Sequence, residues 1–466
     1  MQASRANLSD QFKVLMIFFY LLILIMPLEN HPIWEHHLGP LTVIKYIGLA
    51  CVAVAVIYLP IRKGGAPPLF ETWQARMFIL LFLFALISYV TKGYNERSSF
   101  ENPLLTYASF LLLFFVTATM LDSPKRLRRV LLAGIGAVGF ASLYVIREWQ
   151  RSGFASDFRP GWVVGDANYF TVSVAACLPL AIYLTVVSRS RRERLYCLAC
   201  VVTSLGASWL GASRGGLIAV AVALLWLVGH TRYRWKVMGV LALLAIPPLV
   251  LSSASPVRRL FQPSKFDVAS TQNHWMVLKA GLRMTMANPI FGVGLGQFRH
   301  KMLEYADPQL RHAFIAHDAY IEVSSEMGIP ALMVYLAMLG FCFRSLSRAH
   351  KTALSLGMRS LQEAALGVEA GLIGSSTAVL FVSGQNTKLY WLMIFLSMVL
   401  PSLITAQKKQ GGEPISNSQS VAARMAEENE VPQVAFNIRG LLARRYIRQT
   451  HIVHWTVRSA LLWANR

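Results

Sequence analysis

Two residues of this sequence stand where phosphate and proton chemistry would need them. Arg214 lies in GASRGG at 211–216, directly after one apolar run and before another. An ionisable side chain near membrane depth is costly and usually lines a cavity, so we expect Arg214 to be functional; a tight helical hairpin is the alternative. His317 stands beside Asp318, shortly before a further apolar run. A guanidinium binds phosphate oxygens in pairs, so Arg214 suits phosphate binding. An imidazole accepts protons near neutral pH, so His317 suits general base catalysis, and a structural role is the alternative for this histidine.

A further arginine, Arg159, opens the segment RPGWVVGDAN at 159–168. Its guanidinium can bind a phosphate through two parallel hydrogen bonds. Alternatively, it can form a salt bridge with Asp157 or Asp166 at the rim of a site. The sequence leaves both interpretations open.

A polar stretch at 261–328, between long apolar runs, holds the other candidates. Within it, residues 272–287 are predicted to form an amphipathic helix along the membrane interface, with Lys279 and Arg283 four apart on one side. These two cations are further candidates for binding a diphosphate. The apolar residues of this predicted helix are Trp275, Leu278, Leu282 and Met286.

Three glycines follow, Gly292, Gly294 and Gly296, in the sequence GVGLG. A dinucleotide-binding loop of this type needs a strand before it, and none is predicted here. We therefore expect these glycines to shape a loop whose backbone can approach a ligand. Cys197 and Cys200 form a CxxC pair without the two further ligands that a metal site needs, so we expect no metal and no cofactor.

The composition places these residues in an all-α integral membrane protein. Of the 466 residues, 55% are hydrophobic and 15% are charged, which is more apolar surface than a soluble domain can cover. A transmembrane helix needs about 20 apolar residues, and about twelve segments approach this length. They lie near 13–28, 38–60, 76–91, 103–121, 130–147, 168–188, 195–211, 214–229, 236–252, 328–344, 365–383 and 388–405.

The basic residues predict the orientation of these spans. The net charge is +22, and Lys and Arg gather in the loops after the even-numbered segments, as at 189–194. Basic loops stay in the cytoplasm, so this charge indicates membrane topology rather than nucleic-acid binding, and both termini are predicted to be cytoplasmic. The long segment 253–327, between the ninth and tenth spans, then lies on the outer side, which is the periplasm in a bacterium.

The sequence divides into three parts. Residues 1–405 form the predicted transmembrane domain, and 406–433 form a polar linker. From 434 to 466 there is no Asp or Glu, and arginines recur on one helical face. This pattern predicts a basic amphipathic helix that binds anionic lipids at the cytoplasmic surface; docking to a partner protein is the alternative.

The motifs resemble those of the O-antigen ligase and Wzy-type polymerase superfamily of bacterial membrane glycosyltransferases. The resemblance rests on SRGG at 213–216, NPIFGVGLGQF at 288–298, HDAY and EMG within 317–328, and RPGW and GDAN within 159–168. It spans 159–344, whereas the earlier spans match in topology alone and the tail after 406 lies outside it.

The resemblance implies a fold similar to the GT-C glycosyltransferases and a metal-independent enzyme in the bacterial inner membrane. Such an enzyme moves a glycan from an undecaprenyl-diphosphate carrier to an acceptor hydroxyl, on lipid A–core or a similar acceptor, at the periplasmic face. His317 corresponds to the family histidine that activates the acceptor, and Arg214 to the arginine that meets the diphosphate. The family arginine before the tryptophan is replaced here by Thr271 or Gln272, so we expect another cation to take its place. The substitutes are Arg283, Lys279 and Arg159.

We therefore expect a ligase-type glycosyltransferase. A Wzy-type polymerase of O-antigen or exopolysaccharide is the alternative within the same class. A transporter of lipid-linked sugars is the alternative from another class, and it would place polar residues in the middle of several spans. Here the polar residues gather in the outer loops, which favours chemistry at the membrane surface.

Overall fold

The computed structural model describes residues 16–28, 31, 33, 37–38, 41–62, 67, 69–93, 102–153, 167–211, 213–251 and 265–411. Residues Met1–Lys408 form one compact unit and Lys409–Arg466 a second. The predicted linker beyond Gly411 and the predicted basic helix at 434–466 lie outside the described residues, and so does Arg159.

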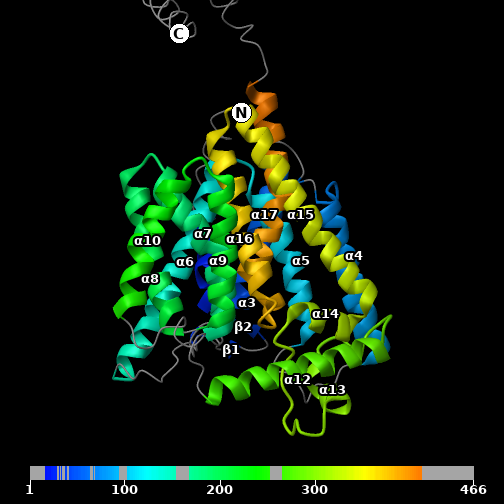
Figure 1. Cartoon of the computed structure of the whole chain (residues 1–466). Coiled ribbons are helices and arrows are strands. Elements are labelled where there is room, and N and C mark those ends of the chain that lie inside the picture. The colour runs from blue at the N-terminus through cyan, green and yellow to red at the C-terminus, as the bar shows by residue number, and fades with distance from the viewer. Residues whose placement is uncertain are drawn as a thin grey trace, which may run out of the picture. The chain divides into compact units, whose positions relative to one another are not determined.

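The described residues are almost entirely helical, as predicted. After the apolar helix Met16–Leu28, whose last turn is a 3-10 helix, the chain forms a bundle of long helices (Figure 1). The helices are α3 (Val43–Tyr58), α4 (Trp73–Lys92), α5 (Pro103–Met120), α6 (Pro124–Arg151), α7 (Ala167–Val187), α8 (Arg191–Gly211), α9 (Arg214–His230), α10 (Arg234–Leu251), α12 (Lys265–Ala287), α13 (Phe298–Tyr305), α14 (Ala319–Met327), α15 (Ile329–Ser355), α16 (Arg359–Ala378) and α17 (Lys388–Gly411). Short 3-10 turns occur at Leu59–Ile61 and Gly384–Asn386. A single antiparallel pair within the described residues joins β1 (His37–Leu38) to β2 (Leu41–Thr42), with His37 opposite Thr42.

The chain is a multi-pass membrane protein. Within the described residues, seven helices are long and apolar enough to cross a membrane, namely α4, α5, α6, α7, α8, α15 and α17. The helices Met16–Leu28, α3 and α9 are apolar but shorter. Each of the twelve predicted segments has a helix in its place, although fewer than twelve helices meet the length and hydropathy of a span.

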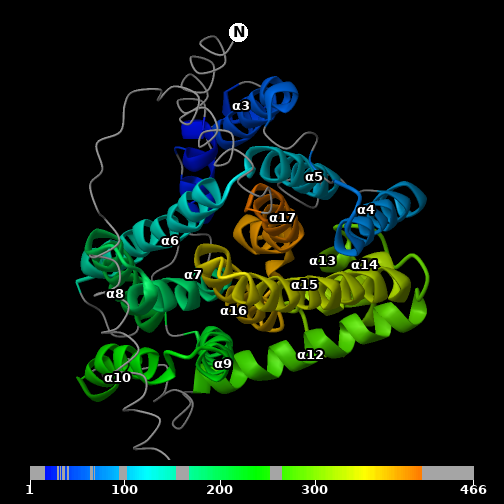
Figure 2. The ribbon, with the colours of Figure 1, turned by 90° about the horizontal axis from the view of Figure 1, so that it is seen from above.

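Helix α16 occupies the predicted span at 365–383 but is less apolar than a lipid-facing helix. It carries Glu363 and Glu369, which are only 7% and 4% exposed. Helices α7, α9 and α15 pack against it, so protein rather than lipid surrounds it (Figure 2). A helix in this position is not required to be apolar on every face, which explains its composition.

Helix α17 lies in the middle of the bundle, between α5, α15 and α16 (Figure 2). Trp391 stacks on Phe110 of α5 with ring centroids 4.8 Å apart, and Phe78 of α4 lies 5.2 Å from the same ring. On the other side, the Tyr390 hydroxyl is 2.8 Å from the hydroxyl of Tyr335 on α15. Since these aromatic side chains are large and fully buried, they hold α17 in a fixed position among its neighbours.

The bundle has two distinct ends because successive helices run in opposite directions (Figure 1). One end holds the starts of α9, α15 and α17, and α12 lies across it with α13 and α14 beside it (Figure 1). The other end holds the starts of α4, α6, α8 and α16. The predicted interfacial helix at 272–287 is therefore part of α12, which begins earlier, at Lys265.

Candidate functional site

Arg214 is the first residue of α9, at the end of the bundle that α12 crosses. The Ser213 hydroxyl caps the helix by accepting a hydrogen bond from the Gly216 backbone N–H, at 3.3 Å. A side chain at Gly216 would overlap Thr171 of α7, and one at Gly215 would overlap Phe381. The two glycines after Arg214 thus let α9 start in close contact with its neighbours, which holds the arginine at the bundle end.

Helix α12 connects Arg214 to His317. Arg214 donates from Nη2 to the hydroxyl of Thr271 at 3.2 Å. One turn further along α12, the ring of His274 meets the ring of His317 edge to face, with centroids 4.5 Å apart. The structure therefore brings the two predicted catalytic residues, more than a hundred positions apart in sequence, to the same helix.

The environment of His274 favours its neutral form. Part of the side chain remains exposed, but the surrounding protein removes solvent from the ring, and the positive charge of Arg214 is close. Desolvation first, and the Arg214 charge second, lower the pKa of His274 below its usual value of 6.5. An uncharged imidazole thus lies between the arginine and the second histidine.

His317 has an unusual backbone conformation, with a φ of 53°, and it is the one residue other than glycine with a positive φ in the described chain. Its backbone N–H donates to the Ser383 hydroxyl at 3.0 Å. The next residue, Asp318, caps α14 by accepting from the Tyr320 and Ile321 N–H groups at 2.8 and 3.1 Å. Burial raises the pKa of Asp318, and these two hydrogen bonds oppose the rise. The Asp318 carboxylate thus caps the start of α14. It positions His317 through the backbone that joins the two residues.

Ser383 links the His317 turn to a buried carboxylate. Glu322, one turn into α14, accepts hydrogen bonds from the side chains of Ser383 and Gln385. Burial raises the pKa of Glu322, which these hydrogen bonds partly offset. Ser383 accepts from the His317 N–H and lies beside Glu322, so it links the strained residue to α14.

The glycine loop supports the same helix from its other end. Gly292, Gly294 and Gly296 all have positive φ, at 68°, 119° and 74°. This conformation lets the Gly296 and Phe298 N–H groups donate to the two carboxylate oxygens of Glu326, at 2.9 and 3.0 Å. Burial and the nearby Glu322 raise the pKa of Glu326, and the two hydrogen bonds oppose this. The loop, which the sequence suggests could approach a ligand, thus binds a carboxylate of its own chain.

The other predicted cations lie further along α12 and have partners of their own. Arg283 donates to the Asp307 carboxylate at 2.8 Å and to the Tyr305 carbonyl at 3.0 Å, which fastens α12 to the segment after α13. The Lys279 ammonium lies over the Trp275 ring, 5.7 Å from its centre. Arg214 and His317 both contact the part of α12 around Thr271 and His274, and Lys279 and Arg283 lie further along that helix.

The predicted apolar face of α12 is not the face that packs on the protein. Trp275 and Met286 are 58% and 76% exposed, whereas Val277, Ala280 and Met284 are buried against α13 and α14. The helix therefore has one face on the protein and another, with Trp275 and Met286, that is exposed, as an interfacial helix requires.

Sequence reasoning missed three residues of this site. His274 directly precedes Trp275 in a stretch already singled out, and its position one turn after Thr271 is the signal that could have found it. Ser383 and Glu322 have no comparable signal, because their importance comes from a contact between α14 and the segment after α16. Among the described residues, no group of three or more His, Cys, Asp or Glu side chains is placed to hold a metal ion.

Part of the chain matches a known protein family. A search of curated proteins finds no related protein. A family model, Wzy_C, described as O-Antigen ligase, matches residues 198–336, a segment that begins within α8, ends within α15 and includes Arg214, His274 and His317. Over residues 198–336, the segment that carries this site is thus similar to the O-antigen ligase domain that the Wzy_C family model describes.

Proposed function

We propose that the protein is a membrane glycosyltransferase of the ligase type. It would move a glycan from an undecaprenyl-diphosphate carrier to a hydroxyl of lipid A–core or a similar acceptor, at the periplasmic face of the bacterial inner membrane. The observation that carries this proposal is the convergence of Arg214 and His317 on α12, within the segment that matches the O-antigen ligase family.

The geometry supports a division of labour between the two residues. During transfer, the bond between the sugar C1 and the carrier diphosphate breaks, and a bond from C1 to the acceptor oxygen forms. The departing diphosphate carries the negative charge, and the acceptor hydroxyl loses a proton. Arg214 would stabilise the diphosphate, since within the described residues only its Nη2 has a hydrogen-bond partner. His317 would accept the proton.

His274 replaces neither of them in this proposal. Because its pKa is lowered, it is uncharged at neutral pH and does not supply the second cation that the resemblance implies. Its ring instead packs against His317 and limits how the catalytic imidazole can turn. The candidates for a second cation that meets the diphosphate are Arg159, Lys279 and Arg283.

Single substitutions test the assignment. His317→Ala should lower transfer by about 10²- to 10⁴-fold, the usual contribution of a general base. Arg214→Ala should lower it by about 10²- to 10³-fold, the usual cost of removing a preorganised donor to developing charge. Matched controls are His312→Ala and Arg311→Ala, two exposed residues in the segment before His317, and both should retain activity.

The measurement is transfer by purified, reconstituted protein given undecaprenyl-diphosphate glycan, with and without lipid A–core. Glycan on lipid A–core and release of the carrier diphosphate would support the ligase. Lengthening of the glycan on the carrier alone would replace it with a polymerase. Full activity of both site variants would show that the chemistry takes place elsewhere.

A further inference from the structure

A concave site lies at the opposite end of the bundle from His317. A cavity of about 550 Å³ opens between the start of α4, the later half of α15 and the later half of α17. This volume is within the range of about 300 to 1,000 Å³ that is typical of sites for small molecules. Trp73, Phe341, Arg344 and Arg348 are among the residues that line it.

The two arginines give the cavity its chemistry. Arg344 and Arg348 lie one turn apart on the same face of α15, and both are exposed. Neither has an ion pair or a hydrogen bond with another described residue, although Glu71, an acidic residue, also lines the cavity. Two guanidinium groups at this spacing present paired N–H donors that match the oxygens of a phosphate.

The depth of the arginines shows which phosphates can reach them. Arg344 is fifteen residues after Ile329, the first residue of α15, and so lies about 22 Å along the helix axis. The hydrocarbon core of a bilayer is about 30 Å thick. Taking the start of α15 as the outer boundary of that core, Arg344 lies near the inner boundary, close to the head groups of the other leaflet. An arginine there needs an anionic partner from the membrane or must extend toward water.

Aromatic residues place the cavity at the same boundary. Trp73, at the start of α4, is 57% exposed and stacks on Phe341 of α15 with ring centroids 6.0 Å apart. The Arg76 guanidinium also lies over the Trp73 ring, 4.9 Å from its centre. Tryptophan side chains are enriched where acyl chains meet head groups.

An apolar stripe continues from the cavity toward the middle of the bundle. On α15, the face that carries Arg344 continues through Gly340, beside which there is open space, to Leu336 and Met333. The last two are 48% and 66% exposed. On α4, the exposed residues Leu80, Leu83 and Ile87 follow Trp73 on one side of the helix. A cationic pocket above an exposed apolar stripe matches a molecule with a phosphate head and acyl tails.

We propose that this cavity is a binding site for a membrane phospholipid with an anionic head group. The phosphodiester lies between Arg344 and Arg348, and the acyl chains lie along the exposed stripe of α4 and α15. With the predicted orientation, the lipid comes from the cytoplasmic leaflet. The site is separate from the proposed catalytic site, and its occupancy does not depend on what the protein transfers.

The test is binding of phosphatidylglycerol with a fluorescent acyl chain to the full-length protein, purified and delipidated in a neutral detergent. The double variant Arg344→Ala/Arg348→Ala should weaken binding by about tenfold or more, given what two cations near a membrane surface contribute. The matched control is Lys125→Ala/Arg129→Ala, which removes two exposed cations, also one turn apart, from the same end of the bundle. This control should bind the lipid like the unchanged protein.

Competition identifies the source of the phosphate. Unlabelled phosphatidylglycerol should displace the probe, and phosphatidylcholine or inorganic phosphate at equal concentration should not. Equal loss of binding in both double variants would overturn the proposal, because any two cations at this end of the bundle would then attract the lipid equally well. Displacement by inorganic phosphate would also overturn it, because the cavity would then bind the free anion.

Discussion

His274 lies near Arg214 and His317, and a positive charge on either one disfavours the charged form of His274. Arg214 is already positive, and His317 becomes positive if it accepts a proton from the acceptor. A protonated His274 in contact with the His317 ring would oppose that step. The lowered pKa of His274 therefore keeps a like charge away from the proposed base at neutral pH.

This lowered pKa predicts how the stability of the protein depends on pH. The folded state binds fewer protons at His274 than the unfolded state does once the pH falls below 6.5, so the free energy of unfolding should decrease on acidification through that value. His274→Gln removes this contribution. When the pH is lowered from above 6.5 to below it, the variant should therefore lose less stability than the unchanged protein does. Thermal unfolding in detergent at the two pH values measures the difference.

His300→Gln is the control, since His300 is an exposed histidine of the neighbouring helix α13. It should leave the pH dependence as it is. If His274→Gln and His300→Gln behave alike, the environment of His274 does not have the proposed effect.

The sequence singled out Arg214 and His317 as candidates but not the residues that contact them in the structure. Arg214 and His317 are recognisable because each is a polar, chemically capable residue beside an apolar run. The partners depend on contacts between segments far apart in the chain, such as Ser383 with the His317 backbone. The positive φ of His317 has no signature in the sequence either, because it is imposed by those contacts.

At the scale of elements, α14 and the glycine loop form one unit. The Val293 N–H donates to the Ser325 carbonyl at 2.8 Å, and the Gly294 N–H to the Glu326 carbonyl at 3.2 Å. Ser88 of α4 donates to the same Glu326 carbonyl at 2.7 Å. The loop thus fixes the end of α14, and the start of α14 carries His317, so the loop positions the proposed base through nine residues of helix.

Two glycines with similar backbone angles separate the effect of close packing from that of backbone strain. Gly292 has a φ of 68° and Gly357 a φ of 66°, but a side chain at Gly292 would overlap the Glu326 backbone, whereas one at Gly357 would meet open space. Gly357→Ala should cost about 1 kcal/mol through strain alone. Gly292→Ala should cost about 1 to 3 kcal/mol more, since the end of α14 must move.

Thermal unfolding and glycan transfer should both be measured for this pair. Gly292→Ala should lower the transfer activity of the folded protein as well as its stability, because the start of α14 moves with its end. If both variants lost the same amount of stability and of activity, the contact between the loop and α14 would not position His317, which would contradict the prediction.

Elements were more predictable than their roles. Long apolar runs indicate helices reliably, which is why a helix stands at every predicted segment. The sequence does not reveal which helix is central. The segments of α7, α16 and the peripheral α4 were therefore all predicted simply as membrane spans. In the structure, 89% of the most apolar stretch of α7 is buried inside the protein, whereas 33% of the corresponding stretch of α4 is buried.

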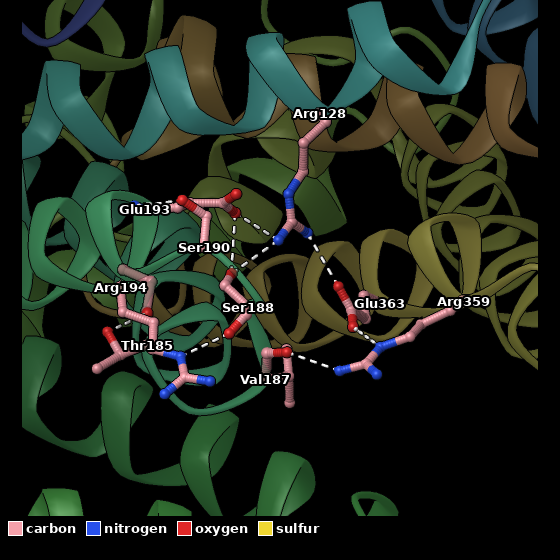
Figure 3. Close-up of polar contacts among 10 residues, drawn as sticks. Arg128, Thr185, Val187, Ser188, Ser190, Glu193, Arg194, Arg359 and Glu363 are labelled. Carbon is pink, nitrogen blue, oxygen red and sulfur yellow. Dashed lines mark hydrogen bonds and ion pairs between the residues drawn. The ribbon is translucent and has the colours of Figure 1, made fainter.

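At the scale of the whole molecule, the two ends of the bundle are held by different means. The site end depends on hydrogen bonds between short helices and loops. The other end contains a charge network in which Arg128 of α6 lies between Glu193 of α8 and Glu363 of α16 (Figure 3). Arg128 also donates to the Ser188 hydroxyl at 2.8 Å, and Arg359 donates to Glu363 at 2.8 Å. The network connects α6, α8 and α16 with the segment after α7.

This network should stabilise the bundle far more than a surface ion pair does. The side chain of Glu363 is 9% exposed and that of Arg128 17%, whereas Arg283 and Asp307 of the exposed pair are 49% and 32% exposed. Breaking a fully buried pair costs about 3 to 5 kcal/mol, and a pair at the surface contributes about 0 to 1 kcal/mol. Since Arg359 is 36% exposed and both arginines keep other partners, we expect Glu363→Gln to cost about 2 kcal/mol.

Asp307→Asn is the matched control, because it also converts one carboxylate of an ion pair into an amide, and it should cost less than about 1 kcal/mol. Unfolding of the two variants in the same detergent measures the difference. In reconstituted membranes, Glu363→Gln should retain glycan transfer, since the network lies at the opposite end of the bundle from His317. A loss of transfer without a loss of stability would instead couple the two ends, and the rigid α16 that runs between them would be the element that carries the coupling.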